Sequence, residues 1–293
     1  MTTSRIADLS LSQNSIQYLQ SNLSQISDLQ NEASTGKRLM KPSDSPVDIG
    51  QSLHLRAGLS RNTQLATNIS DAEGWLGTTD TTLGQMNTQL QQVNTLVLQA
   101  VNGSNDQTAR DALANQIDQI RQSLLGLANT QYSNRPLFGG TSGGSVAYDA
   151  SGAYVGTSAA VQRTIAPGVQ VQVNVNGDST FGPPGNDVFT TLAQISDAIH
   201  GNQSLTALSA QLKTQTQTIQ TAQAMVGATY ARVDSTKSQN TTNASTMTQN
   251  LSNVEDADMA QVLMNLQAQE TTYQAALAAA AKAIQPSLAA FLQ

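Results

Sequence analysis

The two ends of this chain each carry a stripe of apolar residues at alternating steps of three and four, the spacing of a coiled-coil helix. Neither stripe has an apolar partner within its own segment. The N-terminal stripe consists of Leu9, Ile16, Leu19, Leu23, Ile26 and Ala33. The C-terminal stripe consists of Met259, Leu263, Leu266, Tyr273, Leu277, Ala280, Ile284 and Phe291, to which we add the neighbouring Leu288. The pattern predicts that the two terminal helices pair.

Pairing alone cannot hold the two ends in place. The large side chains of the N-terminal stripe bury too little apolar surface to offset the conformational entropy lost when about 30 residues become ordered. We therefore expect both ends to be largely disordered in the free subunit and to fold against neighbouring subunits. The stripes are then an assembly interface, although an amphipathic stripe is also typical of an ordinary bundle core.

The composition limits the classes of function. Acidic residues outnumber basic ones by 20 to 14, which gives a net charge of −6, and no basic patch stands out, so nucleic-acid binding is not expected. The absence of cysteine excludes disulfides and thiolate metal sites. No run of about 18 apolar residues could span a bilayer, so we expect no membrane insertion. The opening residues also lack the pattern of a cleaved secretory signal.

The first half of the chain is predicted to be helical. A helix over about residues 4–35 is expected to end at Gly36, because glycine is common just after a helix C-terminus. Pro42 and Pro46 then prevent a continuous helix. Residues 65–100 carry the most regular apolar repeat of the chain. Residues 109–127 carry another after a short turn, so we interpret these two segments as an antiparallel pair in the subunit's own core.

Residues 137–186 have a different, glycine-rich composition. Val169, Val171, Val173 and Val175 alternate with polar residues before Asn176-Gly177, which predicts a strand leading into a turn. Helix is predicted to resume near Asp187 and again near Ser204.

This order predicts a mainly α fold, with a long-helix bundle, a terminal coiled coil and a small inserted β domain. Residues 1–45 and 250–293 would form the terminal coiled-coil domain, and residues 46–136 and 187–249 the helical bundle. Residues 137–186 would form a small β-rich outer domain.

Several blocks resemble the bacterial flagellin family. Residues 33–39 (ASTGKRL) and 42–46 (PSDSP) are similar to a family block near the N-terminus, and residues 68–76 (NISDAEGWL) resemble the segment that follows it. Residues 254–260 (VEDADMA) and 267–277 resemble the C-terminal part of the family. Within the family, residues 134–141 (NRPLFGGT) resemble a turn of the subunits that join the flagellar hook to the filament.

The resemblance implies an extracellular structural subunit of the bacterial flagellum, exported through the flagellar type III apparatus. Its implied partners are hook-associated protein 1, flagellin, copies of itself in a ring, and a flagellar export chaperone. A short filament flagellin is an alternative within the family. A secreted coiled-coil adhesin or effector that binds host surfaces through residues 137–186 is an alternative of another class.

Catalytic and metal-site patterns are weak, and we predict no enzyme, cofactor or metal site. Residues 140–144 match GxSxG around Ser142, and Asp197 and His200 follow in the order of a hydrolase triad. That motif needs a helix directly after the serine, whereas a glycine and a strand-like run follow here. The acidic residues Glu255, Asp256 and Asp258 lack the glycine of a calcium loop, so we interpret them as acids of a helix's first turn. We expect surface or capping roles for His54 and His200.

Overall fold

A computed structural model describes residues 2–101 and 106–289 of the chain. These residues are mainly α-helical and form two small antiparallel sheets, so the predicted fold class is confirmed. The chain divides into two compact units. One unit comprises residues 1–60 and 245–293, and the other comprises residues 61–244. The further division of residues 61–244 into a bundle and a β-rich domain stays a prediction.

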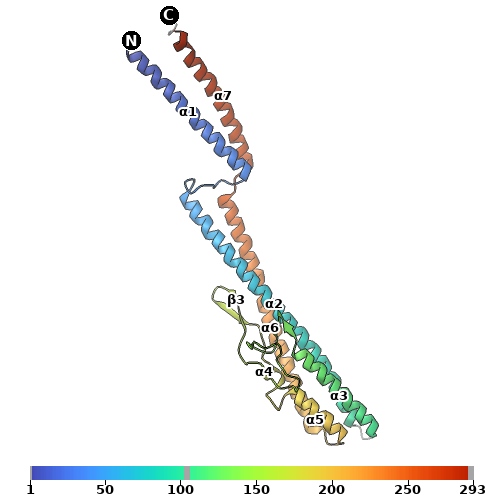
Figure 1. Cartoon of the computed structure of the whole chain (residues 1–293). Coiled ribbons are helices and arrows are strands. Elements are labelled where there is room, and N and C mark those ends of the chain that lie inside the picture. Colours follow the sequence, from blue (N-terminus) through green and yellow to red (C-terminus); the bar gives the residue numbers. More distant parts are fainter. Residues whose placement is uncertain (1, 102–105, 290–293) are drawn as a thin grey trace. The chain divides into compact units, whose positions relative to one another are not determined.

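The unit of residues 1–60 and 245–293 consists of the two terminal helices and the ends of two long ones. Helix α1 spans Thr2–Thr35, α2 spans Pro46–Val101, α6 spans Thr206–Glu255 and α7 spans Met259–Ala289. Helices α1 and α7 lie side by side, as predicted (Figure 1). Gly36 ends α1 as expected and adopts a φ of +68°, which glycine tolerates without strain.

Helix α2 begins 19 residues before the apolar repeat from which it was predicted. Pro46 is its first residue, where the missing N–H costs nothing because the first helical N–H groups have no partner inside the helix. The hydroxyl of Ser45 accepts a hydrogen bond from the backbone N–H of Asp48 at 3.3 Å and caps the start. Pro46 was expected only to interrupt the helical pattern, and it is instead the first residue of α2.

The described residues of the unit 61–244 share a hydrophobic core. The predicted stripe of α2 is buried from Ile69 to Val97, and it packs with α3 (Gln107–Ala128), α5 (Val188–His200) and α6. Helix resumes after Asp187, as predicted, and the side chain of Asp187 caps α5, since its Oδ1 accepts a hydrogen bond from the N–H of Thr190 at 2.9 Å. Trp75, the single tryptophan, is buried on α2.

Four short strands and one short helix lie between α3 and α5, and two of these strands and the helix belong to the inserted segment of residues 137–186. β1 (Gln131–Tyr132) pairs with β2 (Arg135–Pro136), and β3 (Gln162–Ala166) pairs with β4 (Val169–Gln172), both antiparallel. The predicted strand is present as β4 but ends at Gln172. The predicted turn at Asn176-Gly177 is instead the start of helix α4 (Gly177–Phe181), and the β3–β4 hairpin turns at Pro167-Gly168.

The inserted segment shares the helical core. The ring of Tyr148 lies 4.9 Å from that of Phe189 on α5, and the rings of Phe138 and Phe181 are also 4.9 Å apart. Aromatic contacts at these distances add to the burial of apolar surface. The strands are thus fixed on the helices by side chains that both parts contribute.

Candidate assembly surface

The two terminal helices face each other through a partly polar row of side chains. On α1 the buried and half-buried residues include Leu19, Asn22, Ile26, Leu29 and Ala33, and on α7 they are Val262, Leu266, Gln269, Tyr273, Ala276 and Ala280. Both rows advance by threes and fours, as in a coiled coil. The amide Nε2 of Gln269 donates hydrogen bonds to Asn22 Oδ1 at 3.3 Å and to Gln25 Oε1 at 2.7 Å.

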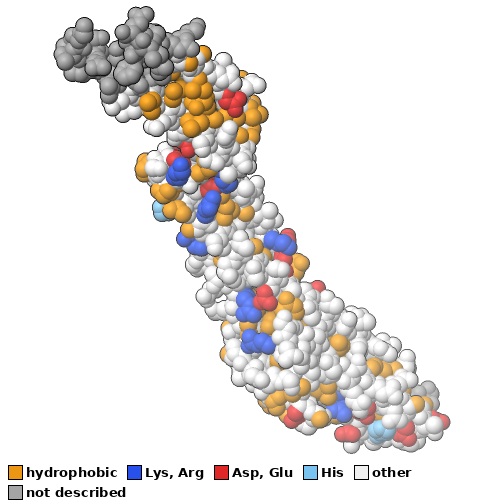
Figure 2. Space-filling view, turned by 45° about the horizontal axis from the view of Figure 1, so that its top comes forward, with side chains coloured by type: hydrophobic (Ala, Val, Ile, Leu, Met, Phe, Trp, Pro, Cys, Tyr) orange, Lys and Arg blue, Asp and Glu red, His pale blue; other side chains and the backbone are white. Residues whose placement is uncertain are grey.

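Only part of each predicted stripe lies in this contact. Leu19, Ile26, Leu266 and Tyr273 face the partner helix, and Ile26 and Val262 are the most buried of the described apolar side chains there, at 7% and 5% exposure. The other predicted side chains point to solvent: Ile16 is 50% exposed, Leu23 54%, Met259 38%, Leu263 53% and Leu277 43%. Figure 2 shows hydrophobic side chains on the surface next to the grey terminal residues.

Four predicted interface side chains cannot be assigned to either the helix contact or the exposed surface. Phe291 lies outside the described residues, and so do the side chains of Leu9, Ile284 and Leu288. Tyr18 and Met264 add to the exposed apolar surface of α1 and α7, although they are not part of the predicted stripes. The stripes predicted from apolar residues at steps of three and four did not include Tyr18 or Met264.

The two segments that connect the paired helices are bonded to each other. Lys37, after α1, forms a single antiparallel bridge with Asp256, after α6. The N–H of Arg38 donates to the carbonyl oxygen of Glu255 at 2.7 Å, and the N–H of Ala257 donates to that of Gly36 at 2.9 Å. The segment from α1 to α2 and the segment from α6 to α7 therefore share backbone hydrogen bonds.

Glu255, the last residue of α6, is a buried carboxylate with three side-chain donors. Arg56 on α2 donates from Nε and Nη2 to its two oxygens, each at 2.7 Å, and Lys37 Nζ lies 2.5 Å from Oε2. The hydroxyl of Ser52 donates to Oε1. Together Arg56, Lys37 and Ser52 lower the pKa of Glu255 to about 2, in spite of its burial. The carboxylate is therefore charged at neutral pH.

Sequence analysis predicted a different role for Glu255. Asp258 does cap α7, because its Oδ1 accepts hydrogen bonds from the N–H groups of Ala260 and Gln261 at 3.0 and 3.3 Å. Glu255, however, ends α6 and does not lie in the first turn of α7. Its partners are about 200 positions away, so local spacing could not reveal the cluster. Within the described residues, no group of three or more acids and histidines is placed to hold a metal ion.

The residues of the hydrolase-like pattern do not form a triad. Ser142 lies in a turn, no helix follows it before α4, and its Oγ has no hydrogen-bond partner among the described residues. Asp197 and His200 lie on the same helix, α5, as predicted. His200 Nδ1 pairs with Asp111 Oδ1 at 2.8 Å, so its partner lies on α3. His54 is exposed on α2.

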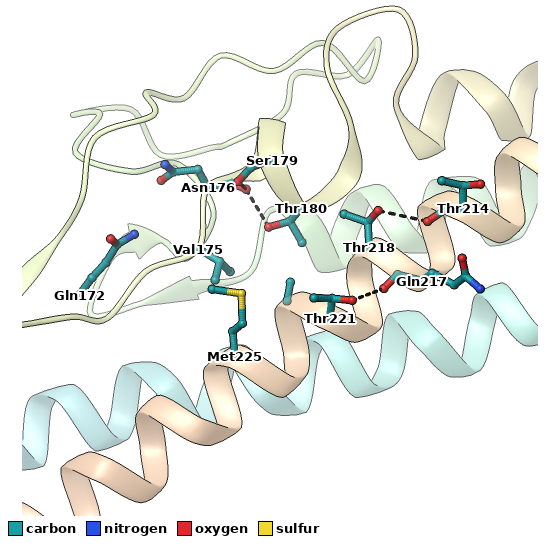
Figure 3. Close-up of a pocket in the computed structure, with 11 residues that line it drawn as sticks. Gln172, Val175, Asn176, Ser179, Thr180, Thr214, Gln217, Thr218, Thr221 and Met225 are labelled. Atoms are coloured by element: carbon teal, nitrogen blue, oxygen red, sulfur yellow. Dashed lines mark hydrogen bonds between the residues drawn. The ribbon is translucent and has the colours of Figure 1, made fainter.

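A groove of about 490 Å³ lies between α6 and the segment after β4. Figure 3 shows the side chain of Met225 on α6 reaching towards Val175, with a row of threonines along α6. The hydroxyls of Thr214, Thr218 and Thr221 each donate to a carbonyl oxygen four residues earlier, as does that of Thr180. None of the residues that line the groove is charged. Its chemistry suits a neutral group and not an ion.

Comparison with known proteins agrees with the resemblance to the flagellins. The family model described as the bacterial flagellin N-terminal helical region matches residues 6–143. Flagellar hook-associated protein 3 of Escherichia coli is 28% identical over 152 residues, which are 51% of this chain and 48% of that protein. Flagellar hook-associated protein 3 of Salmonella typhimurium is 26% identical over 190 residues, 58% of this chain and 60% of that protein.

A solved structure shows the same fold. The crystal structure of Bacillus cereus FlgL is similar with a TM-score of 0.61 and 24% identity, over 68% of this chain and 99% of that chain. The predicted likeness to the flagellin family, and within it to hook-associated protein 3, is confirmed. The chain matches less than two thirds of the length of either curated relative. None of the described helices is long and apolar enough to cross a membrane.

Proposed function

We propose that this chain is a structural subunit of the bacterial flagellum that joins the hook to the filament. It assembles through α1 and α7, whose exposed apolar side chains contact neighbouring subunits. The observation that carries the proposal is the exposure of Ile16 and Leu23 on α1 and of Leu263 and Leu277 on α7. The match to hook-associated protein 3 supports the position in the flagellum.

The geometry explains why these helices need further partners. In a coiled coil each apolar position packs between residues of a facing helix, and here α1 and α7 cover only one side of each other. Apolar residues gathered on a surface mark an interaction site more often than scattered ones do. Additional helices from neighbouring subunits would bury the exposed side chains. Leu9, Ile284, Leu288 and Phe291 belong to the proposed interface on the basis of the sequence pattern alone.

The implied partners follow from this position. Hook-associated protein 1 would contact the subunit on the hook side and flagellin on the filament side, and copies of the chain would form a ring between them. A flagellar export chaperone would bind the C-terminal helix before export through the type III apparatus. The assembled subunit would be extracellular. We propose no enzymatic activity and no cofactor.

Deletion and complementation test the proposal. A strain without the gene should lose its filaments and release flagellin into the medium, and the gene on a plasmid should restore attached filaments. Intact filaments of normal length in the deleted strain, with no second copy present, would contradict the role at the junction.

A short filament flagellin is the second candidate, because the matching family model is that of flagellin itself. Deletion would then remove the filament without releasing another flagellin. Trimming both termini distinguishes a junction subunit from an adhesin. A trimmed junction subunit would no longer be incorporated into flagella, whereas a trimmed adhesin would still bind host surfaces through residues 137–186.

A further inference from the structure

The contact between α1 and α7 does not by itself define one register. Ile26 and Val262 are the described apolar side chains buried below a tenth in it, and the row also contains the amides of Asn22 and Gln269. A helix pair with only two such buried apolar side chains in its contact loses little apolar burial when one helix shifts along its axis. Something outside the row must fix the register.

The Glu255 cluster joins every segment that leads into the pair. Lys37 comes from the segment after α1, Ser52 and Arg56 come from the start of α2, and Glu255 itself ends α6 four residues before α7 begins. Arg38 adds two bonds to the same turn, from its N–H to the Glu255 carbonyl and from Nη2 to the Val254 carbonyl at 3.0 Å. The Glu255 side chain thus connects α2 to two crossovers, namely the segment from α1 to α2 and the segment from α6 to α7.

We propose that Glu255 is a positioning residue that fixes the register of α1 against α7, and so aligns their exposed apolar side chains for assembly. The inference rests on the proposed function, because it concerns how the same surface is presented. Glu255 need not touch a neighbouring subunit to act in this way.

The chemistry of a buried carboxylate explains why it sets a position. A charged group that is 2% exposed is stable only when its partners stay within hydrogen-bonding distance. If either crossover slid by one residue, Lys37 or the carboxylate would lose its partner, and the charge would be left without compensation. The energy of apolar contacts changes gradually when helices slide past each other. The two hydrogen bonds between a carboxylate and an arginine are instead lost at once, because they need one orientation and one distance. A buried ion pair of this kind therefore fixes the alignment of the helices more than it adds to the free energy of folding.

The test compares Glu255→Gln with Glu73→Gln. Both changes remove a carboxylate that takes part in ion pairing: Glu73 Oε2 lies 2.7 Å from Lys237 Nζ, and Glu255 pairs with both Lys37 and Arg56. Glu73, however, lies far in sequence from both crossovers. Each variant is expressed in the deletion strain, and attached filaments and exported subunit are counted. We expect Glu255→Gln to be exported at the normal level but incorporated at least tenfold less often, and Glu73→Gln to be incorporated normally. Normal incorporation of Glu255→Gln would overturn the inference.

A cysteine pair separates loss of register from general instability. The chain has no cysteine, and the amide ends of the Gln25 and Gln269 side chains are hydrogen-bonded at 2.7 Å, so the two positions face each other across the helix pair. After export, Gln25→Cys and Gln269→Cys can be joined by a thiol-reactive crosslinker that spans two glutamine side chains and contains a reducible disulfide. With Glu255 intact, crosslinking this pair must leave incorporation normal. In the Glu255→Gln background, crosslinking should restore incorporation and a reducing agent should remove it again. Failure to restore it would contradict a register role. Failure of the unaltered chain to restore filaments would instead reject the proposed function.

Discussion

Arg56 donates to both carboxylate oxygens of Glu255, from Nε and Nη2 at 2.7 Å each, across 199 positions of sequence. This two-point contact joins the first turns of α2 to the last residue of α6. Because the guanidinium is planar and presents two parallel N–H groups, it matches a carboxylate in one orientation only. Lysine at position 56 would keep the charge but lose this orientation.

The depressed pKa of Glu255 makes this end of α2 and α6 sensitive to acid. The pKa falls from an ordinary value of 4.5 to about 2 in the folded chain, so the stabilisation is complete above about pH 4.5 and is lost as pH falls towards 2. At 1.36 kcal/mol per unit, the effect is at most about 3 kcal/mol. The amides of residues 46–60 should therefore lose protection from hydrogen exchange as pH falls from about 5 to about 2.5, after correction for the intrinsic pH dependence of exchange.

Glu255→Gln is the control for this measurement. Other acids also have a lowered pKa, among them Asp44, which accepts hydrogen bonds from the N–H groups of Lys41 and Met40. Only the difference between the two proteins therefore reports Glu255. An equal pH dependence in both would show that Glu255 does not titrate in this way.

Aspartate at the exposed positions of α7 should block assembly. Leu263→Asp and Leu277→Asp place a charge where we propose that neighbouring subunits pack, and burial of an unpaired charge is costly. Incorporation into flagella should be lost, while the melting temperature of the free subunit should hardly change. Gln267→Asp, an exposed polar position on the same helix, is the matched control and should be incorporated. A large fall in melting temperature for the leucine variants would mean that α7 belongs to the subunit's own core.

The sequence predicted the helices where apolar residues repeat without interruption. Every predicted stripe position of α2 from Ile69 to Val97 is buried, because these residues pack within one core. Across residues 235–248 the stripe of α6 fades, yet the helix continues. There the buried amides of Asn62 and Asn240 each donate to the other's carbonyl oxygen, at 3.0 and 3.2 Å. A hydropathy pattern cannot detect a contact made of paired amides.

The terminal stripes show a second limit of sequence patterns. The spacing gave the helices and their apolar residues, but it could not separate Leu266, which faces α1, from Leu263, which is exposed. Both lie on the apolar side of the same helix, and only the position of the partner distinguishes them. The cluster of Glu255 with Arg56 was likewise not predicted, since its members are joined by the fold alone.

Two glycine-to-alanine changes should act in opposite directions on residues 61–244. Gly140 has a φ of +61°, and a Cβ there would overlap the carbonyl oxygen of Thr157. Gly140→Ala should therefore destabilise this unit by more than about 2 kcal/mol. Gly126 lies within α3 with no atom near the position of a Cβ, so Gly126→Ala should stabilise it by about 1 kcal/mol.

Trp75 provides the measurement for both glycine variants. It is buried and its ring lies 5.7 Å from that of Tyr132, so its fluorescence should report unfolding of residues 61–244. Urea midpoints that move in the same direction for both changes would show that the backbone at Gly140 or at Gly126 differs from the one described.

Hydrogen exchange of the purified subunit tests the premise on which the proposed function depends. The contact of α1 with α7 buries few large side chains, whereas the stripe of α2 from Ile69 to Val97 is buried throughout. Since opening free energies follow the amount of buried apolar contact, amides of α1 and α7 should exchange at least about 100-fold faster than those of residues 69–97. Assembled flagella should show protection in all of them, because neighbouring subunits then cover the exposed apolar side chains. Equal protection of α1, α7 and residues 69–97 in the free subunit would mean that the terminal helices are stable without neighbours, and assembly would then need another driving contact.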